Sequence, residues 1–202
     1  MTLIAVEGLD GAGKTTQVAM LADALSTVDV VSFPRYDTFF GRRIRDLLDG
    51  ADGVSAQTVD PRSMALWYAL DRAQWARDRK PRDDDVVVLN RYTLSNAVYQ
   101  AARSADPGLF EWVLRLEFEE LGLPRPDLTV VLDVPPDVSR DRVTGRDGEG
   151  DVYERSRDLL SRVRDGYLAA AARLPDVVVV SAVGAPAEVH AAVLAALAPV
   201  IP

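Results

Sequence analysis

The stretch of this 202-residue sequence that decides the fold is Gly8-Leu9-Asp10-Gly11-Ala12-Gly13-Lys14-Thr15. It follows a short apolar run, Thr2 to Val6, and precedes a segment, Thr15 to Ser26, whose apolar residues recur at helical spacing. Glycines in a turn between a strand and a helix let successive backbone N–H groups face one anion, and the helix adds its positive end. The pattern G-x-x-x-x-G-K-[ST] in this context predicts a loop that binds the phosphates of a nucleotide.

Two side chains of this loop carry the chemistry expected of a bound triphosphate. The Lys14 ammonium is expected to reach the β- and γ-phosphates, and the Thr15 hydroxyl is expected to bind Mg²⁺. The alternative is a glycine-rich turn with one exposed lysine, which the strand, the spacing and the helix together disfavour. The sequence therefore predicts a bound purine triphosphate. The expected nucleotide contacts within the loop are Gly8, Leu9, Asp10, Gly11, Ala12, Gly13, Lys14 and Thr15.

Strand and helix patterns alternate along the whole chain. Apolar runs predict strands after the first one at Val28–Phe33, Val86–Leu89, Leu128–Leu132 and Val177–Val180. All are almost continuously apolar, which predicts strands buried on both faces, as in a parallel sheet. Helical patterns begin at Pro61 behind the N-cap Asp60 and recur at Thr93–Arg103, Pro107–Leu121, Tyr153–Leu174 and Ala185–Ala198. We expect an α/β three-layer sandwich: a five-stranded parallel sheet with helices on both faces, in a single domain over residues 1–202.

The composition excludes several kinds of site. The chain has no cysteine, which excludes disulfides, thiolate metal sites and a thiol nucleophile. Its one histidine, His190, lies in an alanine-rich helical pattern, where a partly exposed position without a catalytic role is expected. The net charge of −8 opposes general binding to nucleic acid or to an anionic membrane. No apolar run reaches the roughly 18–20 residues of a membrane span, so we expect a soluble, cytoplasmic protein.

Three polar clusters are expected near the phosphate loop. Phe33-Pro34-Arg35-Tyr36 follows the second strand, Ala69-Leu70-Asp71-Arg72-Ala73 belongs to the helix that begins at Pro61, and Asn90-Arg91-Tyr92-Thr93-Leu94-Ser95-Asn96 follows the third strand. Ligands of open α/β folds bind at the carboxyl edge of the sheet, where these clusters should converge. Their three arginines are planar donors suited to phosphate or base-edge oxygens. Surface salt bridges are the alternative for an isolated set of arginines.

Together with the phosphate loop, these clusters resemble the thymidylate kinase family, whose members phosphorylate dTMP with ATP. The resemblance extends from the first strand to Tyr153-Glu154-Arg155 and implies a P-loop kinase fold. It also implies ATP and Mg²⁺ as donor and cofactor, dTMP as acceptor, and a homodimer formed through helix faces such as Phe110 to Leu121.

The resemblance also implies roles for the residues of the clusters. Arg91 would hold the acceptor phosphate, and Arg72 would contact the thymine edge. Tyr68 would stack on the base, although a position in the core beside Trp67 is the alternative. For the asparagine and tyrosines, capping and core packing remain alternatives. The implied substrate contacts are Phe33, Arg35, Tyr36, Tyr68, Arg72, Arg91, Asn96 to the base, Tyr99 beside the sugar, and Tyr153.

The sequence departs from the family at Asn90, where the family has an aspartate. A neutral amide cannot offer a carboxylate's charge to Mg²⁺ or its waters. We therefore expect the metal at Asp10 with Thr15, or at Glu154 or Asp151; a weakened enzyme is the alternative. Leu132-Asp133 resembles the end of a Walker-B strand, but the family places that function elsewhere.

A polar segment at about residues 142–152 resembles the lid that closes over ATP, and its part from Thr144 to Asp151 is expected to be a mobile loop. In the family the catalytic arginine belongs to the phosphate loop or to the lid. Here Gly11-Ala12 stands where the first class has arginine, so Arg146 is expected to neutralise charge on the transferred group and Arg142 to contact the nucleotide. An exposed arginine in a flexible turn is the alternative for Arg146.

The implied reaction is in-line transfer of the γ-phosphoryl group of MgATP to dTMP, with Asp10, Lys14, Arg91 and Arg146 as the catalytic set. Two other readings stay open. One is a kinase for another nucleoside or nucleoside monophosphate, which would share the loop and the lid. The other is a nucleotide-dependent switch or binding protein, against which stand the lid arginines and the absence of an Asn-Lys-x-Asp run.

Overall fold

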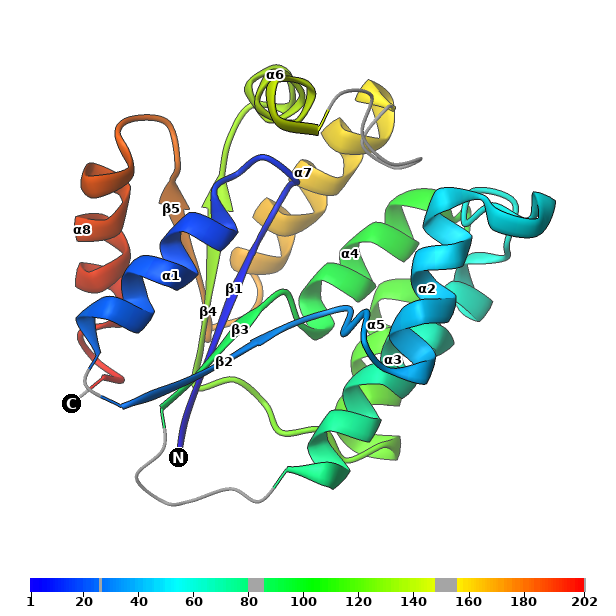
Figure 1. The fold of residues 1–202 in the computed structure, drawn as a ribbon, viewed down its shortest axis with the longest axis horizontal. Helices are drawn as coiled ribbons and strands as arrows, with labels where there is room; N and C mark the ends of the chain where they lie inside the picture. The colour runs from blue at the N-terminus through cyan, green and yellow to red at the C-terminus, as the bar shows by residue number, and fades with distance from the viewer. Residues whose placement is uncertain (26, 80–85, 148–155, 202) are drawn as a thin grey trace.

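The computed structural model describes residues 1–25, 27–79, 86–147 and 156–201, without the side chains of residues 52, 146 and 147. Five parallel strands form one sheet in the order β2-β3-β1-β4-β5 (Figure 1). Each lies where the apolar runs predict a strand, so the α/β class is confirmed. The bounds are Thr2–Gly8 for β1, Val28–Ser32 for β2, Val86–Asn90 for β3, Leu128–Asp133 for β4 and Val177–Ser181 for β5.

The central strand β1 places the phosphate loop at the middle of the sheet edge. Val6 of β1 lies opposite Asn90 of β3, and Gly8 lies opposite Leu132 of β4. The chain builds β2 and β3 on one side of β1 and then crosses to build β4 and β5 on the other. A reversal of this kind opens a crevice at the carboxyl ends of the strands, and the loop after β1 lies there.

The two outer strands differ from the expectation of burial on both faces. The inner strands β1, β3 and β4 are buried over nearly their whole length. By contrast, Val30 of β2 is 40% exposed and Val179 of β5 is 41% exposed. An edge strand has a neighbour on one side only, so the helical layers cover it less completely. The continuous apolar runs therefore indicate strands correctly but overstate the burial of the edges.

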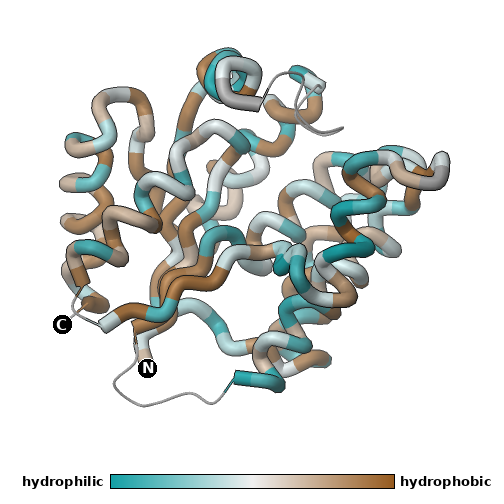
Figure 2. The backbone as a smooth tube through the Cα atoms, viewed as in Figure 1, coloured by the Kyte–Doolittle hydropathy of each residue, from teal (hydrophilic) through white to brown (hydrophobic). Residues whose placement is uncertain are grey.

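Helices cover both faces of the sheet (Figure 1). One face carries α1 (Lys14–Ala24) and α8 (Pro186–Leu197), which pack against each other. The other face carries α4 (Thr93–Arg103) and α7 (Arg157–Ala171). Beyond α4 lie α3 (Pro61–Asp78), α5 (Leu109–Arg115) and, against α3, α2 (Phe39–Asp49). Figure 2 shows the hydrophobic residues running through the strands between these layers, as the buried core requires.

Several helix predictions are confirmed in detail. The Asp60 carboxylate accepts hydrogen bonds from the backbone N of Arg62 at 2.9 Å and of Ser63 at 3.1 Å, so it caps α3 as expected. His190 lies half-buried in α8 with Nδ1 3.2 Å from Oε1 of Gln17. Among the described residues, none of the helices combines the length and the apolar character needed to cross a membrane.

Other elements differ from the sequence prediction. The helices α2 and α6 (Pro136–Asp147) and a short 3₁₀ turn at Ala51–Gly53 are not predicted. The helix expected over 107–121 is α5 continued by a π-helical turn, Leu116–Glu120. The predicted loop at Thr144 is wrong for residues 144–147, which form the last turn of α6; residues 148–151 of that loop lie outside the described residues.

Candidate functional site

The phosphate loop connects the end of β1 to the start of α1. Gly8, Gly11 and Gly13 have φ values of 135°, 73° and 92°, a region that side chains rarely adopt. A Cβ on Gly8 would also lie 2.5 Å from the carbonyl oxygen of Leu132. No side chain caps α1 at Gly13, and its first turn has no acidic residue. The first N–H groups of α1 are therefore available to an anion placed in the loop.

Lys14 directs its ammonium group back into this loop. Its side chain is buried, with Nζ 2.8 Å from the carbonyl oxygen of Leu9 and 3.2 Å from that of Gly8. Nζ also lies 3.7 Å from Oδ1 of Asp10. The positive charge thus sits inside the concave face of the loop, where the phosphates of a nucleotide would bind.

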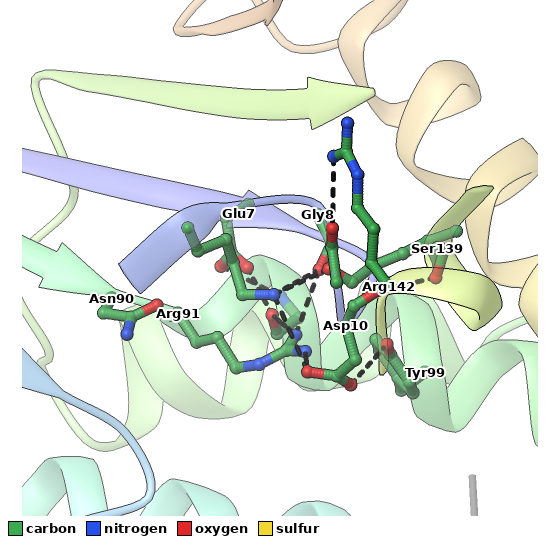
Figure 3. Close-up of polar contacts among 12 residues, drawn as sticks. Glu7, Gly8, Asp10, Asn90, Arg91, Tyr99, Ser139 and Arg142 are labelled. Carbon is green, nitrogen blue, oxygen red and sulfur yellow. Dashed lines mark hydrogen bonds and ion pairs between the residues drawn. The ribbon is translucent and has the colours of Figure 1, made fainter. Parts of the chain in front are cut away.

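An ion pair joins the loop to the segment after β3. Nη2 of Arg91 donates to Oδ1 of Asp10 at 2.6 Å, and the Tyr99 hydroxyl donates to Oδ2 at 3.3 Å (Figure 3). Burial alone would raise the pKa of Asp10, but the charges of Arg91 and Lys14 outweigh it and hold that pKa well below its usual range. Burial likewise would lower the pKa of Arg91, but Asp10 raises it well above the ordinary value. Both groups are therefore ionised at neutral pH.

The backbone at Arg91 adopts an unusual conformation that turns its side chain toward the loop. Its φ is 66°, which is uncommon for a residue with a Cβ and costs free energy. Its backbone N donates to Val6 O at 3.0 Å, and Nη1 donates to Gly8 O at 3.2 Å and to Ser95 Oγ at 3.0 Å. These contacts hold the guanidinium between the phosphate loop and α4.

A cavity that is open to solvent lies beside the Asp10–Arg91 pair; together with the adjoining solvent space it measures about 560 Å³. Seven of the nine predicted substrate contacts line it, and they come from the segments after β2 and β3 and from α3 and α4. The lining residues are Asp10, Phe33, Pro34, Tyr36, Leu48, Tyr68, Arg72, Arg91, Ser95, Asn96, Tyr99 and Gln100.

A buried ion pair forms the floor of this cavity. Nε and Nη2 of Arg72 donate to the two carboxylate oxygens of Glu117 at 2.6 and 2.5 Å, and both side chains are almost fully buried. Glu117 also accepts from Thr93 Oγ1 and from Asn96 Nδ2, each at 2.7 Å. Burial would lower the pKa of Arg72, but Glu117 raises it. The pair therefore fixes the plane of a charged guanidinium that faces the cavity.

Two side-chain amides of α4 leave hydrogen-bonding capacity unused in the cavity. Asn96 donates through Nδ2 to Ala65 O at 3.0 Å and to Glu117, while its buried Oδ1 has no partner. Gln100 accepts through Oε1 from Arg103, while its buried Nε2 has no partner. Buried polar groups are rarely left unpaired, so these two atoms are candidate partners for a polar ligand or for water in the cavity.

Sequence reasoning missed Gln100 and Glu117, although each has a signal. Gln100 lies four residues after Asn96, on the same face of a predicted helix. Glu117 falls in line with Leu109 and Val113 on the apolar face of the helical pattern at 107–121. A charged residue at a buried helix position needs a partner, and Arg72 supplies it.

Some predicted site residues lie elsewhere. Arg35 does not line the cavity: its Nε is 3.3 Å from Asp71 Oδ1 and its Nη2 donates to Asp71 O at 3.1 Å, which fixes the segment after β2 to α3. Arg142 comes to the loop from α6, with Nη1 3.3 Å from Gly11 O and 3.2 Å from Ala182 O. The predictions for Asp151, Tyr153, Glu154 and the side chain of Arg146 lie outside the described residues.

The protein offers few oxygen ligands beside the loop, which fits a Mg²⁺ ion that takes most of its ligands from a bound nucleotide. Within the described ranges, no group of three or more histidine or acidic residues could hold a metal. Both carboxylate oxygens of Asp133 accept from Arg164, at 2.7 and 2.8 Å. Asn90 lies apart from the Asp10–Arg91 contact (Figure 3). Among the described residues beside the loop, the candidates are the Thr15 hydroxyl and Asp10, whose Oδ1 accepts from Arg91 and whose Oδ2 accepts from Tyr99 at the longer distance of 3.3 Å. Mg²⁺ commonly uses one or two protein oxygens together with substrate phosphates.

Comparison with known proteins agrees with this geometry. The family model of thymidylate kinase matches residues 6–193. The chain belongs to the thymidylate kinase family. A thymidylate kinase of Mycobacterium tuberculosis is 39% identical over 186 residues, which are 85% of this chain and 86% of that protein. A probable thymidylate kinase of Thermococcus onnurineus is 34% identical over 196 residues, 93% of this chain and 92% of that protein.

A solved structure shows the same fold for another thymidylate kinase. The enzyme from Candida albicans superimposes with a TM-score of 0.79 at 22% sequence identity, over 98% of this chain and 91% of its own. The P-loop kinase sandwich predicted from the sequence is therefore confirmed.

Proposed function

We propose that this thymidylate kinase family protein transfers the γ-phosphoryl group of MgATP to the 5′-phosphate of dTMP, which gives ADP and the dTDP needed for dTTP synthesis. One observation carries the proposal. The 2.6 Å contact of Arg91 with Asp10 places a fixed guanidinium between the phosphate loop and the cavity, where donor and acceptor phosphates would meet.

The loop would bind ATP through its backbone N–H groups and Lys14. On binding, Lys14 would exchange the carbonyl oxygens of Gly8 and Leu9 for phosphate oxygens. Mg²⁺, when bound, supplies positive charge that neutralises the phosphates, and we propose Asp10 and Thr15 as its protein contacts, with Glu154 as a further candidate. Arg142 already contacts Gly11 and would stay beside the nucleotide.

The cavity would bind dTMP. The thymine edge offers O4, N3–H and O2 in that order, that is, acceptor, donor and acceptor. The unpaired Oδ1 of Asn96 suits the N3–H group, and Arg72 and Gln100 supply donors for oxygens. Phe33 and Tyr68 would lie against the base, Tyr36 beside the phosphate, and Tyr99 beside C2′ of the sugar. Arg35 would act through the loop that it anchors to Asp71.

The acceptor phosphate is itself a nucleophile at neutral pH, so the reaction needs no general base. Catalysis would consist of alignment and charge neutralisation by Lys14, Arg91 and Arg146. Arg91 would grip the acceptor phosphate, and Arg146 in the lid at about 142–152 would neutralise the transferred group. Closure of that lid would keep water from the γ-phosphate.

A coupled assay of ADP release tests the proposed function. The purified protein with MgATP is given dTMP, dUMP, dCMP, AMP or no acceptor. We expect ADP release that depends on the acceptor and is fastest with dTMP. A strong preference for dCMP or AMP would overturn the thymine assignment, and ADP release at the same low rate without acceptor would indicate a nucleotide-dependent switch or binding protein.

We further propose that the protein acts in the cytoplasm as a homodimer. Leu66 and Leu70 on α3 are 43% and 39% exposed, and Leu121 after α5 is 38% exposed. The core of the chain itself buries Leu109, Val113 and Leu116. Little of the helix face expected at Phe110–Leu121 is therefore free for a partner, and we propose that α3 supplies the rest of the contact. Light scattering tests it: a mass of one chain, 22.0 kDa, would overturn the dimer.

A further inference from the structure

A buried chain of hydrogen bonds lies directly beneath Arg91. Glu7, the residue before the phosphate loop, is completely buried at the end of β1 (Figure 3). Its Oε1 accepts from the backbone N of Tyr92 at 2.8 Å and of Ser95 at 3.0 Å. Its Oε2 accepts from the Ser95 hydroxyl and, at 3.3 Å, from the Tyr167 hydroxyl. Burial raises the pKa of Glu7, and the hydrogen bonds from Ser95 and the charge of Arg91 oppose that shift. One carboxyl group thus connects β1, α4 and α7.

The first oxygen of Glu7 has a structural task. Tyr92 and Ser95 belong to the N-terminal turn of α4, and no side chain of that helix caps it. Glu7 therefore caps α4 from a strand more than eighty residues earlier in the chain. Both hydrogen bonds at Oε1 come from backbone N–H groups, which can only donate. A substitution that keeps an acceptor at this position should keep the cap.

The second oxygen of Glu7 determines which way the Ser95 hydroxyl points. A serine hydroxyl has one hydrogen to donate and two lone pairs that accept. Arg91 Nη1, at 3.0 Å, can only donate, so Ser95 must present a lone pair to it. Oε2 of Glu7 takes the Ser95 hydrogen, and the Tyr167 hydroxyl, 2.9 Å from Ser95 Oγ and 3.3 Å from Oε2 of Glu7, shares its one hydrogen between these two atoms. The Ser95 hydrogen is thereby directed away from Arg91, and a lone pair faces the guanidinium.

We propose that Ser95 is a positioning residue for Arg91, and that Glu7 and Tyr167 fix the direction of its hydroxyl. The inference rests on the proposed function in one respect, because Arg91 is taken to hold the acceptor phosphate. Gly8 O, Asp10 Oδ1 and Ser95 Oγ then each accept a hydrogen bond from the guanidinium, and Arg91 lines the cavity. None of Glu7, Ser95 or Tyr167 needs to touch the reacting atoms.

The substitution Glu7→Gln isolates this effect. The carbonyl oxygen of the new amide can keep the α4 cap, so its NH₂ group must face Ser95 and Tyr167. A donor then replaces the acceptor, and the Ser95 and Tyr167 hydrogens must compete for fewer lone pairs beside Arg91. Because the amide has nearly the shape of the carboxyl group, packing changes little.

The test is a double-mutant cycle with Ser95→Ala, read by calorimetric dissociation constants for dTMP and thymidine. Thymidine lacks the phosphate that Arg91 would hold. We expect Glu7→Gln to weaken dTMP binding by about tenfold and thymidine binding by less than about twofold. In the Ser95→Ala background the same substitution should cost dTMP binding less than about twofold, because no hydroxyl remains to be turned.

An equal loss in both backgrounds, or an equal loss for dTMP and thymidine, would overturn the proposal and leave Glu7 as a helix cap alone. A wild-type protein that neither binds dTMP nor releases ADP with it would instead refute the proposed function, before any variant is compared.

Tyr167→Phe gives a second route should Glu7→Gln fail to fold. It removes one hydroxyl and keeps the ring, so we expect about threefold weaker dTMP binding with thymidine unchanged. The matched control is Tyr92→Phe, because the buried Tyr92 hydroxyl donates to Pro124 O at 3.0 Å and does not contact Arg91, Ser95 or Glu7. Tyr92→Phe should leave dTMP binding unchanged. Equal effects of the two tyrosine substitutions would contradict the role of Tyr167.

Discussion

The phosphate loop and the cavity beside it are both built to hold a nucleotide, yet they are built in different ways. The loop is eight consecutive residues whose backbone supplies the donors and whose one buried cation is Lys14. The cavity takes its polar groups from side chains of several elements, and its guanidinium at Arg72 is fixed by Glu117, 45 residues away in the sequence. A site made of backbone N–H groups depends on the local turn conformation, whereas a site made of side chains depends on the residues that hold those side chains in place.

This difference determines what a substitution should do in each region. The loop depends on glycines and a helix end, so a change in its side chains should alter catalysis more than folding. The cavity depends on buried charges that neutralise each other, so removing one partner should destabilise the whole protein. The following substitutions test this difference between the loop and the cavity, from the largest expected effect to the smallest.

Removal of the loop cation should have the largest effect on catalysis. We expect Lys14→Ala to lower kcat by about 10³-fold, because a fixed positive charge on the transferred group is lost. The free energy of unfolding should change little, since the Lys14 ammonium donates to carbonyl oxygens of its own loop and lies 3.7 Å from Oδ1 of Asp10. Steady-state ADP release and urea unfolding measure the two effects. A kcat within tenfold of the wild type would contradict the role assigned to the loop.

Removal of the carboxylate below the cavity should instead reduce stability. Glu117→Ala leaves Arg72 buried without its counter-charge, and we expect a loss of about 3 kcal/mol in the free energy of unfolding. Urea denaturation measures it.

The double substitution of Arg72 to Met with Glu117 to Leu is the control for that prediction. It should recover most of the stability, because neither charge of this buried pair remains, while dTMP binding stays weak. A double variant as unstable as Glu117→Ala would show that the loss comes from packing, or from the Thr93 and Asn96 donors left without an acceptor, rather than from an unpaired charge.

Substitution of the lid arginine should slow the chemical step without weakening substrate binding. We expect Arg146→Ala to lower kcat by about 10²-fold and to leave the dissociation constant of dTMP nearly unchanged, because Arg146 is proposed to act on the transferred phosphoryl group. Rapid mixing with excess enzyme gives the chemical step, and calorimetry gives the dissociation constant. An unchanged chemical step would remove Arg146 from the mechanism.

The departure from the family at Asn90 should give the smallest effect. Asn90→Asp adds a carboxylate at the end of β3, and we expect Mg²⁺ to promote binding of a non-hydrolysable ATP analogue at a severalfold lower concentration. Calorimetry at a series of Mg²⁺ concentrations measures this, and Asn90→Ser serves as a neutral control. If neither nucleotide binding nor turnover responds, Asn90 is not near the metal.

The sequence predicts the loop and the sheet better than it predicts the cavity. The phosphate loop is a local pattern, so eight residues specify it. The five strands are apolar runs between turn signals, and their parallel order follows from the helices between them. By contrast, α6 has only two apolar residues, Val138 and Val143, and so lacks a helical pattern strong enough to predict it.

The partners of the arginines are set by tertiary structure and could not be predicted. Nothing near Arg72 in the sequence indicates Glu117, and nothing near Arg91 indicates Asp10 as its partner. Arg35 has the same donors as these two, yet the structure directs it to Asp71. Residue type alone therefore identifies candidate phosphate ligands, but long-range packing decides which of them face the cavity.

A crystal structure with dTMP and a non-hydrolysable ATP analogue tests the central claim most directly, namely that the loop and the cavity are two halves of one site. The account predicts the analogue's phosphates in the loop, thymine against Tyr68 with N3–H at Asn96 Oδ1, and the dTMP phosphate on Arg91. The attacking oxygen should lie about 3.5 Å from the γ-phosphorus and in line with the bond to be broken. An empty loop, a cavity closed by side chains, or dTMP bound away from Arg91 would contradict it.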